Sequence, residues 1–93
     1  MAFEFDLSEE LKEILYVLNN RDKKLAERIN KKIKEIINCD LNSVNHYQNL
    51  KYEFKDRKRV HIGHFVLTFK IYKEKNFILF INFSHHDEIY ILK

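Results

Sequence analysis

The stretch that decides the fold reads Arg57-Lys-Arg-Val-His-Ile-Gly63-His-Phe-Val-Leu-Thr-Phe-Lys-Ile-Tyr72. Its side chains fall on two faces with the period of two that is typical of β-strands. Gly63-His64 divides the stretch, and glycine can take the positive φ that a tight turn requires. The pattern therefore predicts a β-hairpin, with Arg57, Arg59 and His61 on one face of its first strand.

A second apolar run follows a polar turn at residues 73–76 and extends over residues 77–83. This run is apolar on both faces, which is typical of a central strand that is covered on both sides. Helices can cover only one of these faces. We expect loops or another protein to cover the other.

The residues before the hairpin predict two helices. Residues 2–5 make a short apolar segment that could form an edge strand. Asp6 is the predicted N-cap of the first helix, with Glu9 completing a capping box, and the helix should end near Asn19-Asn20. Residues 22–38 carry apolar side chains at helical spacing and form the second helix, and residues 40–52 form a loop. The expected fold class is α+β: an N-terminal antiparallel helical hairpin packed on a three- to four-stranded antiparallel sheet.

Length and composition limit the alternatives. A chain of 93 residues with 45% hydrophobic and 33% charged residues predicts one domain, residues 1–93. The single cysteine, Cys39, excludes an internal disulfide and a cysteine-built zinc site. The N-terminal twenty residues do not read as a signal peptide, and no apolar run reaches the roughly 18 residues of a membrane span, so no membrane partner is expected.

Charge is distributed unevenly along the chain. Residues 1–50 carry 8 Lys/Arg and 9 Asp/Glu, whereas residues 51–93 carry 9 and 5. The positive half also holds His61, His64, His85 and His86, which suits a polyanionic partner such as RNA or DNA. The lysines and arginines of residues 22–38 are interpreted as a solvated helix face, because Glu27 and Glu35 are interleaved and Glu27 can pair with Lys31.

The histidines could lie close together once the strands pair, with Arg57, Arg59 and Lys70 near them. Histidine transfers protons near neutral pH, and cations hold a phosphate and stabilise charge developing on it. These are the components of a metal-free ribonuclease, in which the ribose 2′-OH is the internal nucleophile. Two alternatives stay open: the histidines could bind zinc, or they could be ordinary hydrogen-bonded surface residues.

The order of elements, the string Lys58 to Ile71 and the terminal Ser84-His-His-Asp-Glu-Ile-Tyr90 resemble the RelE toxins of the RelE/ParE superfamily, above all their YafQ-type and archaeal branch. The resemblance covers nearly the whole chain. It implies a small cytoplasmic toxin without a cofactor or metal. Such toxins form hetero-oligomers with a RelB-like antitoxin and cut mRNA in the ribosomal A site.

The resemblance also implies roles for individual residues. His86 would be general acid or base, with His61 as its partner or as a phosphate contact, and Tyr90 would stack on a base or support the histidines. Arg59 would stabilise the scissile phosphate. The remaining expected RNA contacts are Lys51, Lys55, Arg57, Lys70, Phe65, His64 and His85.

The chain departs from the family pattern in two places. The family often has a Tyr-Arg-Val string on the second hairpin strand, where this chain has Phe65-Val66-Leu67, so an arginine is missing. His64 stands where the branch often has an aspartate. Two other functions remain open: a ParE-like toxin, which shares this fold and inhibits DNA gyrase without cutting RNA, and an inactive module that only binds its antitoxin.

Overall fold

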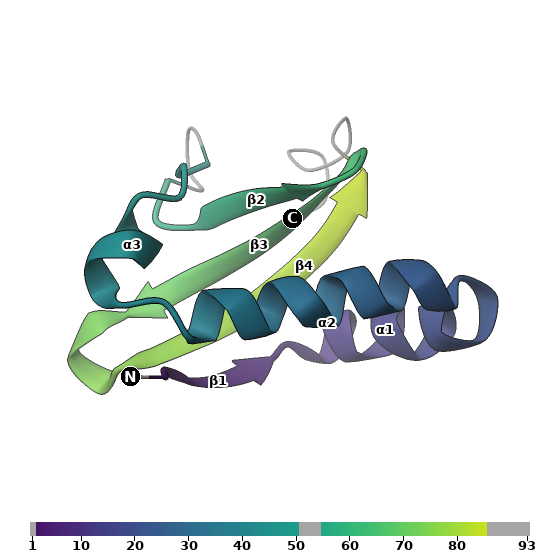
Figure 1. Cartoon of the computed structure of the whole chain (residues 1–93), viewed down its shortest axis with the longest axis horizontal. Coiled ribbons are helices and arrows are strands. Elements are labelled where there is room, and N and C mark those ends of the chain that lie inside the picture. Colours follow the sequence, from purple (N-terminus) through teal and green to yellow (C-terminus); the bar gives the residue numbers. More distant parts are fainter. Residues whose placement is uncertain (1, 51–54, 86–93) are drawn as a thin grey trace.

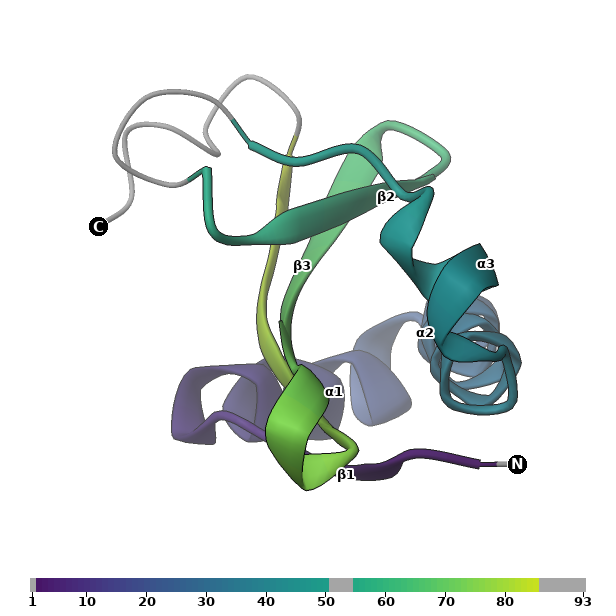
Figure 2. The same ribbon diagram turned by 90° about the vertical axis from the view of Figure 1, so that its left-hand side faces the viewer.

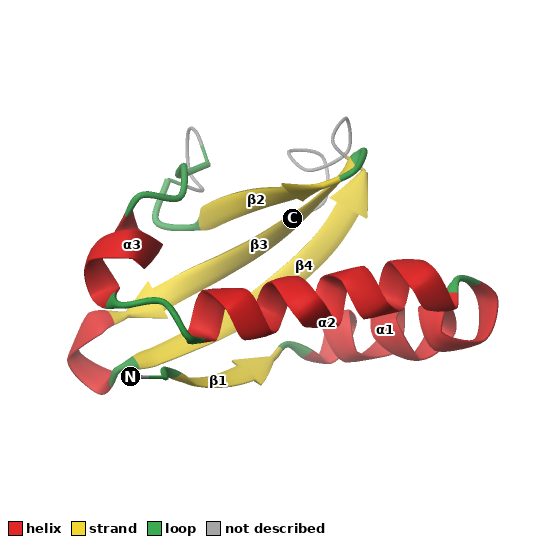
Figure 3. Cartoon of the chain, viewed as in Figure 1, coloured by secondary structure: helices red, strands yellow, loops and turns green. Residues whose placement is uncertain are grey.

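The computed structural model describes residues 2–50 and 55–85. Along the chain these form β1 (Glu4–Leu7), α1 (Glu9–Arg21), α2 (Lys23–Ile37), α3 (Leu41–Asn45), β2 (Lys58–Ile62), β3 (Phe65–Tyr72) and β4 (Phe77–His85). A short 3-10 helix, Lys73–Lys75, joins β3 to β4. The helical hairpin runs along the strands, as Figure 1 and Figure 3 show, and the predicted α+β class is confirmed.

The four strands form one sheet in the order β1-β4-β3-β2. The pairs β2–β3 and β3–β4 are antiparallel, as expected. The edge strand β1, however, pairs with β4 in parallel, so the sheet is mixed rather than wholly antiparallel. A parallel neighbour needs a crossover connection, and the helices and the hairpin that lie between β1 and β4 supply it.

The two long helices place their apolar stripes on one face of the sheet, which we call the inner face. Leu11 and Leu15 of α1 and Ile29, Ile33 and Ile36 of α2 are buried in one cluster. From the sheet, this cluster receives Ile62, Leu67, Phe69, Ile78, Phe80 and Phe83. Figure 2 shows α2 and α3 on the same side of β2 and β3, so the opposite, outer face of the sheet is not covered by α2 or α3.

The start of α1 differs from the prediction. Ser8, not Asp6, is the N-cap, and its Oγ accepts a hydrogen bond from the Leu11 amide at 3.1 Å. The Ser8 hydroxyl also donates to the Ile81 carbonyl of β4. Asp6 instead lies in β1, because pairing with β4 extends that strand to Leu7. The cap therefore fixes the helix and also ties it to the sheet.

One further element was not predicted. Residues 41–45, expected in a loop, form the short helix α3, whose N-cap Asp40 accepts from the Ser43 amide at 2.8 Å. This hydrogen bond lowers the pKa of the Asp40 carboxyl.

Within the described part of the chain, no helix is long and apolar enough to cross a membrane.

Candidate functional site

Cross-strand pairing decides which candidate side chains share a face of the sheet. Arg59 pairs with Thr68, and His61 pairs with Val66. Thr68 and Val66 alternate with the core residues of β3, so both cross-strand pairs lie on the outer face. Arg59 and His61 are two residues apart on one strand, which places their Cα atoms about 6–7 Å apart. The predicted common face of these two residues is confirmed.

Gln48 holds both the backbone and the side chain of Arg59. Its amide donates to the Gln48 carbonyl at 2.8 Å, and its Nη2 donates to the Gln48 Oε1 at 2.7 Å. Its Nε is buried and has no hydrogen-bond partner among the described residues. A buried guanidinium N–H without a partner is unusual in a folded protein. Gln48 orients the guanidinium, and the sequence pattern gave no sign of its role because it lies in a stretch without periodicity.

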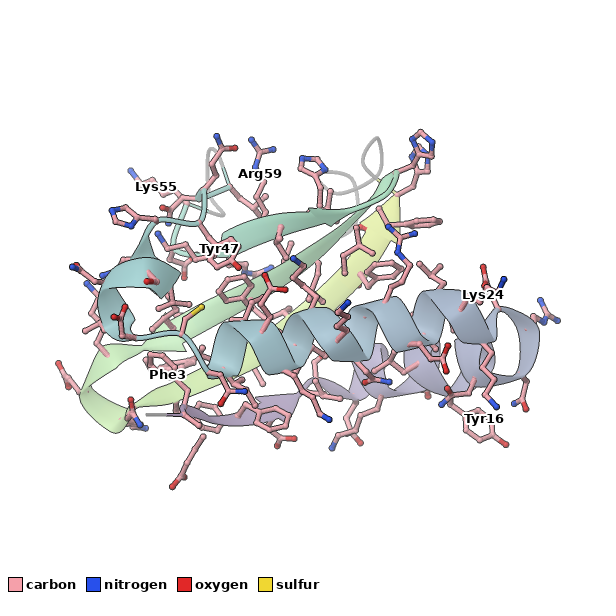
Figure 4. All side chains as sticks on the ribbon, in the orientation of Figure 1. Phe3, Tyr16, Lys24, Tyr47, Lys55 and Arg59 are labelled. Atoms are coloured by element: carbon pink, nitrogen blue, oxygen red, sulfur yellow. The ribbon has the colours of Figure 1, made fainter. Side chains whose placement is uncertain are left out.

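Three other predicted cations, Lys55, Arg57 and Lys70, lie near Arg59 in the chain or on the neighbouring strand β3. Lys55 is exposed and precedes Arg59 by four residues, and Figure 4 shows both at the end of the molecule away from Lys24 and Tyr16 on the helical hairpin. Arg57 precedes β2 by one residue, and its carbonyl accepts from the Leu50 amide at 2.9 Å. Lys70 is on the outer face of β3, where its Nζ lies 3.2 Å from Asp56 Oδ2 and 5.1 Å from the ring centroid of Tyr72.

Lys58 has a structural role rather than a place among these cations. Its Nζ donates to the Asn45 carbonyl at 2.8 Å and to the Asn49 Oδ1 at 2.9 Å. Burial, with a smaller contribution from Lys73, lowers the pKa of this amine. Lys58 thus fastens the segment after α3 to β2, and it does so from the face opposite to Arg59.

The structure does not bring His85 to His61. His85 pairs with Phe65, which lies on the inner face together with Leu67, so His85 and His61 are on opposite faces of the sheet. The expected gathering of these histidines is therefore wrong for this pair. Phe65 stacks on Phe83 with ring centroids 5.0 Å apart, and His85 contacts its edge at 5.7 Å. Both side chains pack with the end of the core, and their contact with RNA stays a prediction.

The cause of this separation is a β-bulge in β4. Thr68 pairs with Asn82 and the next residue, Phe69, pairs with Phe80, so Ile81 is the extra residue. An extra residue shifts the alternation of the strand by one. Phe80 and Phe83, three residues apart, both face the core, and the positions beyond the bulge change face. His64 lies in the turn between β2 and β3 and is exposed.

Three of the predicted site residues, Lys51, His86 and Tyr90, lie outside the described residues. Their proposed roles stay predictions. Within residues 2–50 and 55–85, no three His, Cys, Asp or Glu side chains are grouped closely enough to hold a metal ion. The described candidate site is thus the outer-face group Arg59, His61 and Lys70, with Lys55 and Arg57 beside it.

Comparisons with known proteins give the family. No protein-family model matches the chain. A Methanocaldococcus jannaschii protein named "Putative toxin RelE4" is 39% identical over 89 residues, which are 95% of this chain and 90% of the relative.

Two solved structures share the fold. The first is the intact Escherichia coli RelBE toxin-antitoxin complex, with a TM-score of 0.64, 19% identity and coverage of 90% of this chain and 96% of the matched chain. The second is the Mycobacterium tuberculosis RelBE2 complex, with a TM-score of 0.61, 17% identity and coverage of 92% and 100%. With the near-complete match to the archaeal relative, these findings show that the chain belongs to the RelE family of toxins.

Proposed function

We propose that this protein is the toxin of a toxin–antitoxin pair and cuts mRNA in the ribosomal A site. The observation that carries the proposal is the alignment of His61 with Arg59 on the outer face of β2, with Lys70 on the neighbouring strand. An imidazole that can transfer a proton and a guanidinium that can stabilise charge on a phosphate are two of the groups that RNA cleavage uses. The basic residues Lys55 and Arg57 extend the positive surface along the chain before β2.

The proposed reaction uses the substrate's own nucleophile. A base removes the proton of the ribose 2′-OH, and the 2′ oxygen attacks the adjacent phosphorus. The P–O5′ bond breaks, and an acid protonates the departing 5′ oxygen, which gives a 2′,3′-cyclic phosphate and a 5′-OH. Arg59 would stabilise the negative charge that develops on the phosphoryl oxygens. His61 and His86 would carry the protons, and Tyr90 would stack on a base or support the histidines.

Primer extension on an mRNA under translation by purified ribosomes tests this proposal. Wild type should cut within codons only when ribosomes are present. Loss of a general acid or base typically costs a factor of about 10²–10⁴, so His86→Ala and His61→Ala should cut at least about a hundredfold more slowly. His46→Ala is the matched control, because His46 is the C-cap of α3 and has no proposed catalytic role.

The same experiment separates the nuclease from its alternatives. Thermal melting by circular dichroism should show that all three histidine variants fold. Wild-type rates in both His86→Ala and His61→Ala would contradict the acid–base assignment. A folded toxin that leaves mRNA intact but inhibits DNA supercoiling by gyrase would replace the nuclease with a ParE-like activity.

We also propose that a RelB-like antitoxin neutralises this toxin in a hetero-oligomer. Both solved neighbours named above are toxin–antitoxin complexes. The basic outer face around Arg59 suits an antitoxin segment with acidic side chains. Addition of the protein encoded beside the toxin should stop cleavage in the primer-extension assay, and failure of the two proteins to co-purify would contradict this partnership.

A further inference from the structure

A stripe of cations runs along the exposed side of α2. Lys24, Arg28 and Lys31 are spaced at i, i+4 and i+7, so they lie on one side of the helix, and all three are exposed. The sequence predicted that Glu27 would neutralise Lys31. No such ion pair is present: on the described α2, the ion pair is Lys32 with Glu35, at 3.1 Å. The carboxylates therefore leave Arg28 and Lys31 without a salt bridge among the described residues.

Two of these cations, Arg28 and Lys31, face the β2 edge of the sheet across a cleft of about 320 Å³. The cleft is lined by Arg28, Lys31, Lys32 and Glu35 of α2 and by His61 and Ile62 of β2. Three cations and one carboxylate give this lining an excess of positive charge even when His61 is neutral. The cleft is thus built from two elements that are about thirty residues apart in the sequence.

The turn after β2 lies close to the Arg28 guanidinium. Gly63 has φ of +63°, and a Cβ at this residue would lie 3.5 Å from Arg28 Nη1. This distance is an ordinary van der Waals contact, so glycine is favoured here by its positive φ and not by a lack of space. The Arg28 guanidinium, although exposed, therefore lies next to the turn at the end of β2.

His61 connects the cleft to the outer face. β2 is an edge strand, and His61 lines the cleft while its position in the register places it in the same outer-face row as Val66. The positive surface therefore continues from Arg59 on the outer face, past His61 at the edge, to Arg28 and Lys31 on α2. A chain of phosphates can follow such a surface, because consecutive phosphates of one strand are held by successive cations.

We propose that the cleft between α2 and the β2 edge is a second RNA contact, which binds the phosphodiester backbone on one side of the cleaved nucleotide. This inference rests on the proposed function, since it takes the ligand of the outer face to be RNA. Arg28 would bind a phosphate through its planar fork, and Lys31 would bind the next phosphate as a point charge. The RNA could be the message or ribosomal RNA, since both present the same backbone.

Charge reversal in the cleft tests this proposal. The test variant is Arg28→Glu/Lys31→Glu, and the matched control, Lys23→Glu/Lys34→Glu, makes the same change in net charge at two residues of α2 that do not line the cleft. Arg28→Gln/Lys31→Gln, which only neutralises the cations, is the second test variant in case the reversal impairs folding. Fluorescence anisotropy with a labelled single-stranded RNA and sedimentation with empty ribosomes measure the two possible sources separately.

The test variants should bind RNA about tenfold more weakly in at least one of the two assays. Loss of two phosphate contacts should also reduce the slope of log K against log salt for the single strand by about 1.4, at about 0.7 for each contact. The control should change binding much less. Equal weakening in the control would show a general charge effect and overturn the cleft, and so would unchanged binding in both test variants.

The primer-extension assay keeps this proposal separate from the nuclease. Wild-type cleavage together with unchanged binding in the test variants would remove the cleft and leave the nuclease. Weakened RNA binding in the test variants of a toxin that never cuts would keep the cleft as an RNA contact and remove the nuclease.

Discussion

The two faces of the sheet differ although they are built from the same strands. On the inner face, Leu67, Phe69, Ile78 and Phe80 have no exposed surface. On the outer face, the neighbouring positions of β2 and β3 carry Arg59, His61 and Lys70. Alternation along a strand thus separates the packed face from the face that carries the candidate site, so a substitution on one face need not disturb the other.

The separation between the faces is incomplete at the centre of the sheet. Val66 and Thr68 belong to the outer face, yet they are 0% and 3% exposed. The accessible part of that face is therefore its β2 side, with Arg59 and His61, and the Lys70 end. A variant designed to report on function should change these accessible positions rather than the buried centre.

The largest expected effect breaks the inner face. Phe80→Ala removes a fully buried ring that contacts Phe5 and Phe69 with centroids at 6.2 and 5.6 Å. The cavity and the lost burial should lower the free energy of unfolding by about 3–5 kcal/mol, measured by urea denaturation. The matched control is Leu79→Ala, the next residue on β4, which is half-buried on the outer face. Its cost should be about 1 kcal/mol, and an equal cost for both would show that the two faces are packed alike.

Much of the fold could be predicted from the sequence because its patterns are local. The apolar stripes of α1 and α2 and the alternation around Gly63 each depend on a few neighbouring residues. The N-cap was misplaced because Asp6 and Ser8 are both good caps, and pairing of β1 with β4 decided between them. The parallel direction of β1 was missed for the same reason, since it depends on a partner seventy residues away.

A medium-sized effect tests how α1 is fixed to the sheet. Ser8→Ala removes the N-cap of α1 and the hydrogen bond to the Ile81 carbonyl. The free energy of unfolding should fall by about 1–2 kcal/mol, at the upper end of cap substitutions, because two hydrogen bonds are lost. Asp6→Ala should change it by less than about 0.5 kcal/mol. If chemical denaturation showed a larger loss of unfolding free energy for Asp6→Ala than for Ser8→Ala, Asp6 would be the cap.

The candidate site could be predicted only where alternation is regular. Arg59 and His61 precede the bulge and share a face as expected. His85 comes after the extra residue Ile81. Residues 77–81 are all apolar, so the sequence shows no polar side chain that would mark the shift in alternation at this point. Gln48 and the cleft residue Arg28 were also missed, because contacts between distant elements leave no periodic signal. The sequence thus pointed to candidate residues of the basic half but not to how the strands arrange them, and the chemistry of these residues stays a prediction.

The smallest effect concerns the charge balance of the outer face. Asp56 neutralises Lys70 at 3.2 Å, and the two side chains are 57% and 35% exposed. An exposed ion pair of this kind contributes less than about 1 kcal/mol, so Asp56→Asn should leave the melting temperature nearly unchanged. Lys70 would keep its contact with Tyr72 and lose its competing carboxylate. Single-stranded RNA should then bind about two- to threefold more tightly at low salt, because one more cation is available to the phosphates. Weaker binding in the anisotropy assay would reverse the interpretation of Asp56. The carboxylate would then hold Lys70 in its binding position, and RNA binding by the outer face would depend on this ion pair instead of being weakened by it.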